Sequence, residues 1–107
     1  MNTATLSALA EPNRLQMVEL LREGPLTVGE IADRLHVRQP QASKHLKVLH
    51  EARIVEMRPD ANRRIYRLRP EPFQELDSWL DTFRRMWEDQ FDRLDEYLQE
   101  FQKEEKK

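Results

Sequence analysis

The 107-residue sequence contains no cysteine, only two glycines and no long uninterrupted apolar run. Without cysteine the chain has no disulfide framework, thiolate metal site or cysteine nucleophile. No apolar stretch approaches the roughly 20 residues that a helix needs to cross a bilayer. The first ten residues carry no basic side chain and do not resemble a signal peptide. These absences favour a cytoplasmic protein, and the length fits one domain.

The formal net charge of -2 conceals a basic centre. Residues 34–69 hold 10 basic and 3 acidic side chains, whereas residues 1–33 hold 2 and 5 and residues 70–107 hold 6 and 12. A basic centre between acidic flanks indicates a local anionic partner. Charge alone favours the simpler interpretation of a solvated basic surface. The motifs must therefore decide between such a surface and a binding site for an anionic partner.

Apolar residues that recur every three or four positions predict short helices in the first half of the chain. The first helix covers residues 3–9. The second begins at Pro12, where the missing backbone N–H of proline costs nothing, and it stops before Gly24 and Pro25.

Two further helices joined by a tight connection are predicted between residues 27 and 51. Thr27 is a suitable N-cap, and Glu30 three residues later completes a capping box for a helix that ends near His36. Pro40 can open the next helix. Its inner face consists of Ala42, Leu46 and Leu49.

The periodicity changes beyond residue 52. Residues 54–58 and 64–69 have the composition of two short strands around a polar turn at residues 59–62. In the second strand, Tyr66 and Leu68 alternate with Ile65, Arg67 and Arg69. We therefore expect a β-hairpin, in which Asn62 can serve the turn because Asn tolerates a positive φ.

A long helix is predicted over residues 71–101, and a charged tail over residues 102–107 that we expect to fray. Apolar residues step by three or four positions along the helix, with two consecutive steps of four around Trp87. Such a stutter relaxes supercoiling and favours a compact dimer over a long coiled coil. The helix carries more apolar surface than so small a domain can cover, so we expect dimerisation. A small-molecule pocket between two such helices is the alternative use of the aromatic stripe.

The fourth predicted helix is rich in polar and basic residues near its start. A helix fits the major groove of DNA, where base edges present distinguishable donors and acceptors. The side chains suited to reading those edges are Gln39, Gln41, Ser43, Lys44 and His45. The alternative is an ordinary surface helix, and His45 could instead pack against the third helix as a structural histidine.

Other basic residues in this region are suited to the DNA backbone. Arg38 and Lys47 are placed for phosphates, which fix the register of a protein on DNA without specifying sequence. Arg58, Arg63 and Arg64 cluster around the expected hairpin tip, where they could follow the backbone or enter a narrow minor groove.

Segments 26–32, 39–49 and 64–68 resemble the ArsR family of bacterial winged-helix repressors, and segment 9–15 is similar to the family's opening. The stretch Ser43-Lys44-His45-Leu46 is the most specific part. The resemblance implies a homodimer whose recognition helices enter successive major grooves and whose first and last helices form the interface. The interface residues would then be Leu6, Leu9, Trp79, Leu80, Phe83, Trp87 and Phe91.

Several positions depart from the family pattern. Arg53 stands where a glycine usually ends the recognition helix, and a left-handed backbone there would be strained. Arg38 occupies a position often held by a capping Ser or Thr, and the wing tip lacks its usual glycine. The thiolates and the last-helix histidines through which many relatives sense metals are also missing. We therefore expect no metal or cofactor and place the chain nearest the metal-free, autorepressor-like branch.

Together these patterns predict a mainly α winged helix-turn-helix domain with a β-hairpin wing over residues 1–101. Residues 27–69 would read DNA and residues 71–101 would form the dimerisation helix. The predicted function is a transcriptional repressor that binds double-stranded DNA as a homodimer on an inverted repeat. The alternative is a protein-interaction module with a basic docking surface. An enzyme is not expected, because no nucleophile–base pair or phosphate-binding glycine loop is apparent.

Overall fold

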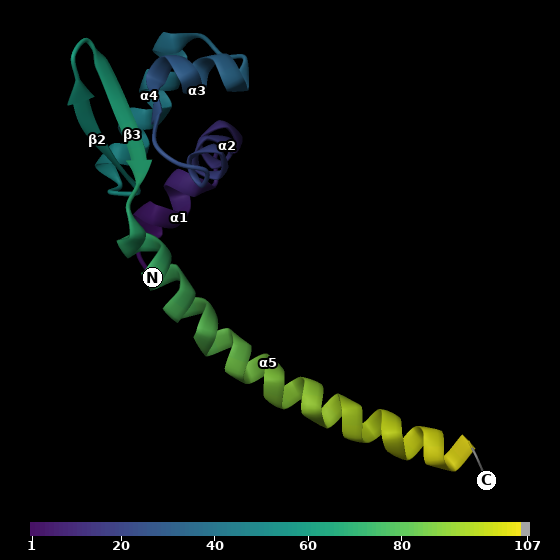
Figure 1. Ribbon diagram of the computed structural model, residues 1–107. Helices are drawn as coiled ribbons and strands as arrows, with labels where there is room; N and C mark the ends of the chain where they lie inside the picture. The colour runs from purple at the N-terminus through teal and green to yellow at the C-terminus, as the bar shows by residue number, and fades with distance from the viewer. Residues whose placement is uncertain (106–107) are drawn as a thin grey trace. The chain divides into compact units, whose positions relative to one another are not determined.

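The computed structural model describes residues 1–105 and divides the chain into two units, residues 1–74 and the residues from 75 onward. Within the described residues the elements occur in the order α1 Thr3–Leu9, α2 Pro12–Leu21, β1 Leu26–Thr27, α3 Val28–Leu35, α4 Gln39–Glu51, β2 Val55–Asp60, β3 Arg63–Leu68 and α5 Pro70–Glu105 (Figure 1). No helix among the described residues is long and apolar enough to cross a membrane.

The four short helices have the predicted positions because local signals define their ends. The capping box of α3 is present: the Glu30 backbone N–H donates to Thr27 Oγ1 at 3.2 Å, and the Thr27 N–H donates to Glu30 Oε1 at 3.1 Å. The helix ends at His36, whose φ of 56° is left-handed. Arg38, at the N-cap of α4, makes no side-chain capping bond, in agreement with the departure noted in the sequence.

The hairpin is confirmed, but its first strand is longer, its second strand is shifted by one residue and its turn is shorter than predicted. Asp60 pairs with Arg63, so the turn consists of Ala61 and Asn62 alone. The positive φ falls on Ala61, at 55°, and not on Asn62. The prediction was wrong because Pro59 and Asp60 have turn-like composition although the strand continues through them.

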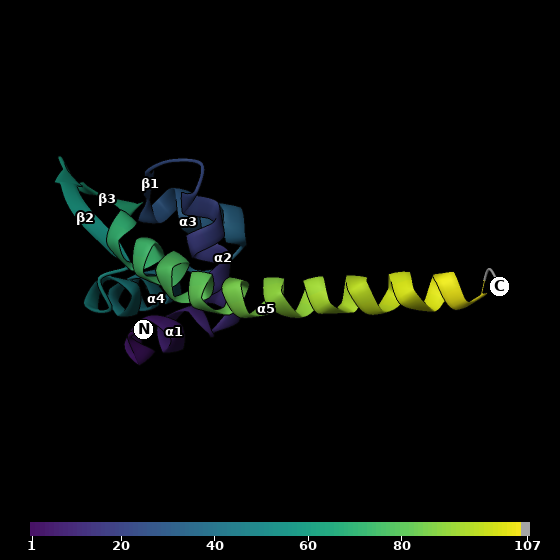
Figure 2. The same ribbon diagram turned by 90° about the horizontal axis from the view of Figure 1, so that it is seen from below.

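The sheet has a third strand that the sequence did not predict. Leu26 and Thr27 pair antiparallel with Tyr66 and Ile65, giving the strand order β1-β3-β2 (Figure 2). A two-residue strand is too short to show an alternating pattern, so only its partner identifies it.

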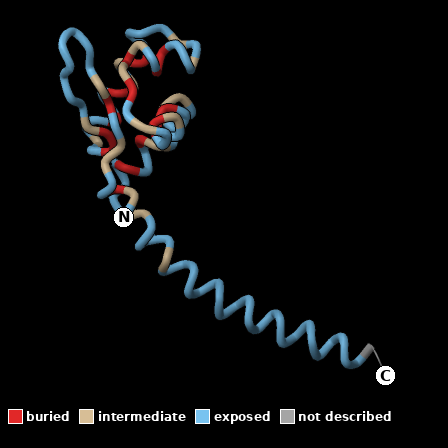
Figure 3. The backbone as a smooth tube through the Cα atoms, viewed as in Figure 1, coloured by how far each residue is buried: buried red, intermediate tan, exposed pale blue. Residues whose placement is uncertain are grey.

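The core of the first unit lies between the helices and the sheet (Figure 3). The predicted inner face of α4, Ala42, Leu46 and Leu49, is completely buried. Met17, Ile31 and Ile54 are equally inaccessible, so α2, α3 and the start of the hairpin all pack on that face. This burial fixes which side of α4 remains exposed. Helices α3 and α4 with the hairpin form the winged helix-turn-helix that the sequence predicts.

Helix α5 begins in the first unit, where Phe73 packs against the core. From residue 75 onward the helix is pale blue along most of its length in Figure 3, and its apolar side chains are 36% to 64% exposed from Trp79 to Phe101. The helix continues through residues 102–105, where a frayed tail was predicted, because Gln, Lys and Glu favour helix and no glycine or proline interrupts them. The rest of the predicted tail, residues 106–107, lies outside the described residues.

Candidate nucleic-acid interface

Helix α4 exposes a polar face opposite its buried stripe. Gln41, Lys44 and Lys47 are exposed on this helix, and Gln39 is exposed at its first position. Because the packed side chains at positions 42, 46 and 49 set the rotation of the helix, the same packing aims Lys44 and Lys47 at solvent. The sequence predicted this division correctly.

A cleft of about 410 Å³ lies between α4 and the hairpin. Lys44 and Lys47 line it from the helix, and Arg64 lines it from β3. Its remaining lining residues are Ser43, His50, Met57 and Tyr66. Three of the predicted cations are therefore brought together by the packing of the hairpin beside α4, although Arg64 is 17 residues away from Lys47 in the chain.

A second cleft, of about 340 Å³, joins the beginnings of α3 and α4 to the wing tip. Gln39 and Ser43 border it from α4, and Arg63 and Arg64 border it from β3. Its other lining residues are Thr27, Val28, Gly29 and Asn62. Ser43 and Arg64 border both clefts, so the two hollows form one continuous surface along α4.

Sequence reasoning missed several residues of this surface. His50 could have been found, because it follows Lys47 and Ser43 at helical spacing. Gly29 and Asn62 carry no comparable signal, since they reach the surface only through the folding of α3 beside the wing.

The three predicted wing arginines do not form one cluster. Arg64 faces α4, whereas Arg58 lies with Ile65 and Arg67 in a separate hollow that also includes Pro25. Side chains of successive strand residues point to opposite faces of a sheet, and the pairing of Arg58 with Ile65 places these two on one face. Arg58 is therefore displaced from the surface that α4 shares with Arg64.

Among the described residues, the lysines and arginines of the predicted contact set have no acidic partner, whereas several basic side chains nearby do. Arg34 Nη1 lies 3.7 Å from Glu23 Oε2. Arg69 Nε lies 3.6 Å from Glu71 Oε2, and Arg67 pairs with Glu56. Across residues 1–105, no ion pair involves any member of the predicted set Arg38, Lys44, Lys47, Arg58, Arg63 and Arg64. Unneutralised cations on one surface are available to an external anion.

Glu30 lies at the edge of this surface and remains ionised. The backbone N–H and hydroxyl of Thr27 hold the pKa of Glu30 below its ordinary value, assisted by the charges of Arg34 and Arg63 and opposed by partial desolvation. The carboxylate therefore belongs to the cap of α3 and weakly offsets the positive charge of Arg63.

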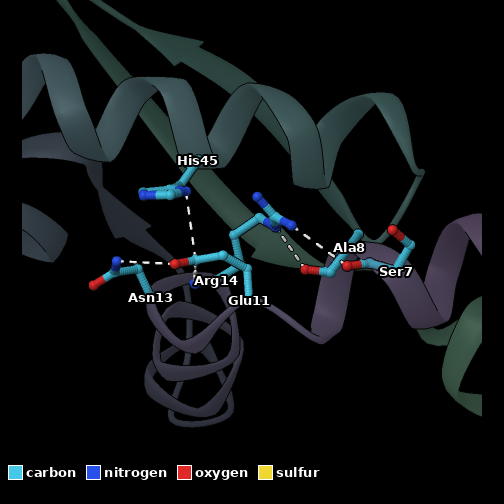
Figure 4. Close-up of polar contacts among 6 residues, drawn as sticks. All are labelled: Ser7, Ala8, Glu11, Asn13, Arg14 and His45. Carbon is cyan, nitrogen blue, oxygen red and sulfur yellow. Dashed lines mark hydrogen bonds and ion pairs between the residues drawn. The ribbon is translucent and has the colours of Figure 1, made fainter.

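His45 is placed differently from the other predicted reading residues (Figure 4). Its side chain is only 18% exposed, and its Nδ1 lies 3.6 Å from Oε2 of Glu11 at the N-cap of α2. The alternative prediction for His45, a structural histidine, had its side chain pack against the third helix. The structure instead gives it a partner between α1 and α2.

The backbone strain expected at Arg53 is present. Its φ is 60°, in the left-handed region that favours glycine, and its N–H donates to the His50 carbonyl at 3.0 Å. The residue reverses the chain between α4 and β2, so this conformation helps to place the wing.

The predicted dimer-interface residues are mostly accessible in the single chain. Leu6 in α1 is 36% exposed, and the exposed fractions in α5 run from 36% for Trp79 to 60% for Phe91. Leu9 differs, because it is half-buried and packs against the core of its own unit. The interface itself stays a prediction.

Helices α3 and α4 pack together, α4 exposes a basic face, and the hairpin adjoins it. These features define a winged helix-turn-helix protein. Residues 11–57 match the family model described as bacterial regulatory protein, arsR family. The chain belongs to the ArsR family of bacterial regulatory proteins.

Three relatives illustrate the similarity. The HTH-type transcriptional regulator Rv2034 of Mycobacterium tuberculosis is 49% identical over 76 residues, which are 71% of each chain. The biofilm growth-associated repressor of Agrobacterium fabrum is 44% identical over 63 residues, 59% of this chain and 54% of that protein. The solution structure of the homodimeric winged helix-turn-helix DNA-binding domain Mb0332 from Mycobacterium bovis superposes with a TM-score of 0.65 at 30% identity. That match covers 76% of this chain and 75% of the other.

Proposed function

We propose that this protein is a transcriptional repressor that binds double-stranded DNA sequence-specifically, as a homodimer on an inverted-repeat operator. The observation that carries the proposal is the surface formed by α4 and the wing, where Lys44, Lys47 and Arg64 lie together without acidic partners. An anion is needed to neutralise these three cations. A DNA duplex supplies phosphates on both sides of a groove that a helix can enter.

The side chains divide by the chemistry that each can perform. Gln39, Gln41 and Lys44 are exposed near the start of α4 and would contact base edges, where Gln can pair with adenine and Lys can donate to guanine. Ser43, on the same turn, can contact either a base or a phosphate. Arg38, Lys47, Arg63 and Arg64 would contact phosphates and set the register. Arg58, on the other face of the wing, would contact the backbone beyond the main surface.

A homodimer is supported by the amount of uncovered apolar surface on α5. Trp79, Leu80, Phe83, Trp87 and Phe91 are each at least 36% exposed, and a large aromatic side chain can bury roughly 150–250 Å². The homodimeric Mb0332 domain supports the same assignment by family. Two copies would present their α4 helices to successive major grooves, with half-sites about one helical turn, or roughly 10–10.5 bp, apart.

Location and chemistry follow from this role. A repressor acts where the DNA is, so we assign the protein to the cytoplasm. Regulation by occupancy of an operator requires no bond to be made or broken, so we assign it no catalytic activity. We also assign it no metal or cofactor, because the histidines lie on the DNA-reading elements and none lies on α5.

The proposal is tested by selecting the duplexes that the protein binds from a random library. The affinity of the protein for the most enriched duplex is then measured over a salt series. Affinity should fall steeply with salt, with a slope of about -0.9 for each phosphate neutralised. Lys44→Ala should reduce discrimination between the selected duplex and its variants, whereas Arg64→Ala should weaken all duplexes similarly.

Arg22→Ala provides the matched control, because Arg22 is an exposed cation at the end of α2, outside both clefts. It should leave affinity and the salt slope unchanged. A wild-type protein that retains no duplex at low salt would refute the proposal. Capture of an acidic protein, unaffected by competitor DNA, would favour the interaction-module alternative.

A further inference from the structure

The side chain of Glu11 lies between α2 and α4 (Figure 4). Its Oε1 accepts a hydrogen bond from the Asn13 amide at 3.0 Å, and its Oε2 accepts one from the Arg14 backbone N–H at 2.9 Å. The same Oε2 faces Nδ1 of His45 on α4. Glu11 therefore caps α2 and, with the same carboxylate, contacts the helix that carries the proposed reading residues.

Arg14 extends this chain of contacts to α1. Its Nε donates to the Ala8 carbonyl at 2.6 Å, and its Nη2 donates to the Ser7 carbonyl at 3.4 Å. The last carbonyls of a helix have no partner within the helix, so this guanidinium satisfies the end of α1. The end of α1, the start of α2 and the middle of α4 are thus joined through two adjacent side chains.

The carboxylate is held in its charged form. Partial desolvation would raise the pKa of Glu11, but hydrogen bonds from Arg14 and Asn13 and the charges of His45 and Arg14 lower the pKa below its ordinary value. Near neutral pH, Glu11 therefore offers an acceptor to His45 on a fixed scaffold.

The remaining contacts of α4 with the other helices are apolar. Ala42, Leu46 and Leu49 set the depth of the helix and which of its faces is buried, but hydrophobic contact is non-directional and leaves small shifts along the helix axis less restrained. Among the described residues, the His45–Glu11 pair is the one side-chain polar contact between α4 and another element. The contact at the centre of α4, with 3.6 Å between His45 Nδ1 and Glu11 Oε2, adds a polar restraint on the position of the helix to the apolar packing.

We propose that His45 is a positioning residue that holds α4 against the α1–α2 corner through Glu11, and that it does not read a base. This inference rests on the proposed function, since α4 is taken as the reading helix. The ring faces the corner while Lys44, its neighbour in sequence, faces solvent. To reach a base the ring would have to leave Glu11.

The test compares His45→Ala, His45→Asn and Glu11→Gln on the selected duplex and on a panel of its single-base-pair variants. His45→Ala should weaken every duplex by a similar factor, roughly 5- to 30-fold. His45→Asn should restore part of the lost affinity, because its Nδ2 keeps a polar donor facing Glu11. Glu11→Gln should weaken binding in the same uniform way, and its addition to His45→Ala should cause little further loss.

Glu51→Gln is the matched control, because it removes one exposed acidic charge from α4 itself without touching the corner. Thermal unfolding of each variant establishes that it is folded at the assay temperature. If His45→Ala fails to fold, Glu11→Gln decides the question, because a uniform loss across the panel supports the inference and a loss confined to one base-pair position overturns it.

Two results would overturn the inference while leaving the proposed function intact. One is a His45→Ala loss confined to a single base-pair position. The other is multiplicative losses in the double variant, with no rescue by His45→Asn. A wild-type protein that binds no duplex would instead refute the proposed function, and the inference with it.

Discussion

Replacement of Arg53 by glycine should stabilise the protein. Arg53 has a φ of 60°, and a left-handed conformation costs a non-glycine residue roughly 1–2 kcal/mol. Glycine removes this cost but loses more conformational entropy on folding, about 0.5–1 kcal/mol. The Arg53 side chain is exposed and has no acidic partner among the described residues, so its loss removes no ion pair.

The expected net effect of Arg53→Gly is a gain of about 0.5–1 kcal/mol in the free energy of unfolding. For a domain of this size that gain raises Tm by roughly 2–8 °C. Calorimetry of wild type and variant at one protein concentration measures it, because the Tm of a dimer depends on concentration.

Two variants serve as controls for this reasoning. Arg53→Lys keeps a β-carbon and a positive charge, so its Tm should stay close to that of the wild type. Gly24→Ala should destabilise, because Gly24 has a φ of 144° that an alanine rarely adopts. A lower Tm for Arg53→Gly than for Arg53→Lys would refute the assignment of strain to position 53.

Other predictions follow from the core, the caps and α5. Leu46→Ala should lower the free energy of unfolding by about 2–5 kcal/mol, measured by urea denaturation, because Leu46 is fully buried. Glu11 and Glu30 have pKa values lowered in the folded state, so their contribution to stability is present above their unfolded pKa and is lost as the pH falls through the folded pKa. An acid titration of Tm should therefore decline less steeply for Glu30→Gln than for wild type. Trp87→Glu should raise the dissociation constant of the proposed dimer at least tenfold, or about 1.4 kcal/mol, as measured by analytical ultracentrifugation. An unchanged constant would remove Trp87 from the interface.

Local patterns were sufficient to predict the helices of the first unit. Thr27 and Glu30 interact across a single turn, so their spacing alone defines the start of α3. The inner face of α4 was likewise predictable, because a stripe at helical spacing has to turn towards whatever core exists. The exposure of Lys44 and Lys47 then followed from the same periodicity.

Features that join distant segments could not be obtained in this way. β1 exists because Leu26 and Thr27 meet β3, and the hairpin register depends on two strands and not on the composition of one. The separation of Arg58 from Arg64 comes from that register, which assigns each to a face of the sheet.

The sequence by itself determined the order of elements, the basic centre and the exposed polar face of α4, because each is encoded within one or two helical turns or in composition. Only the tertiary structure decided that Ser43 and Arg64 share two clefts and that His45 turns towards Glu11. Contacts between residues tens of positions apart depend on how helices and strands pack, and no local spacing specifies which partner a side chain will meet.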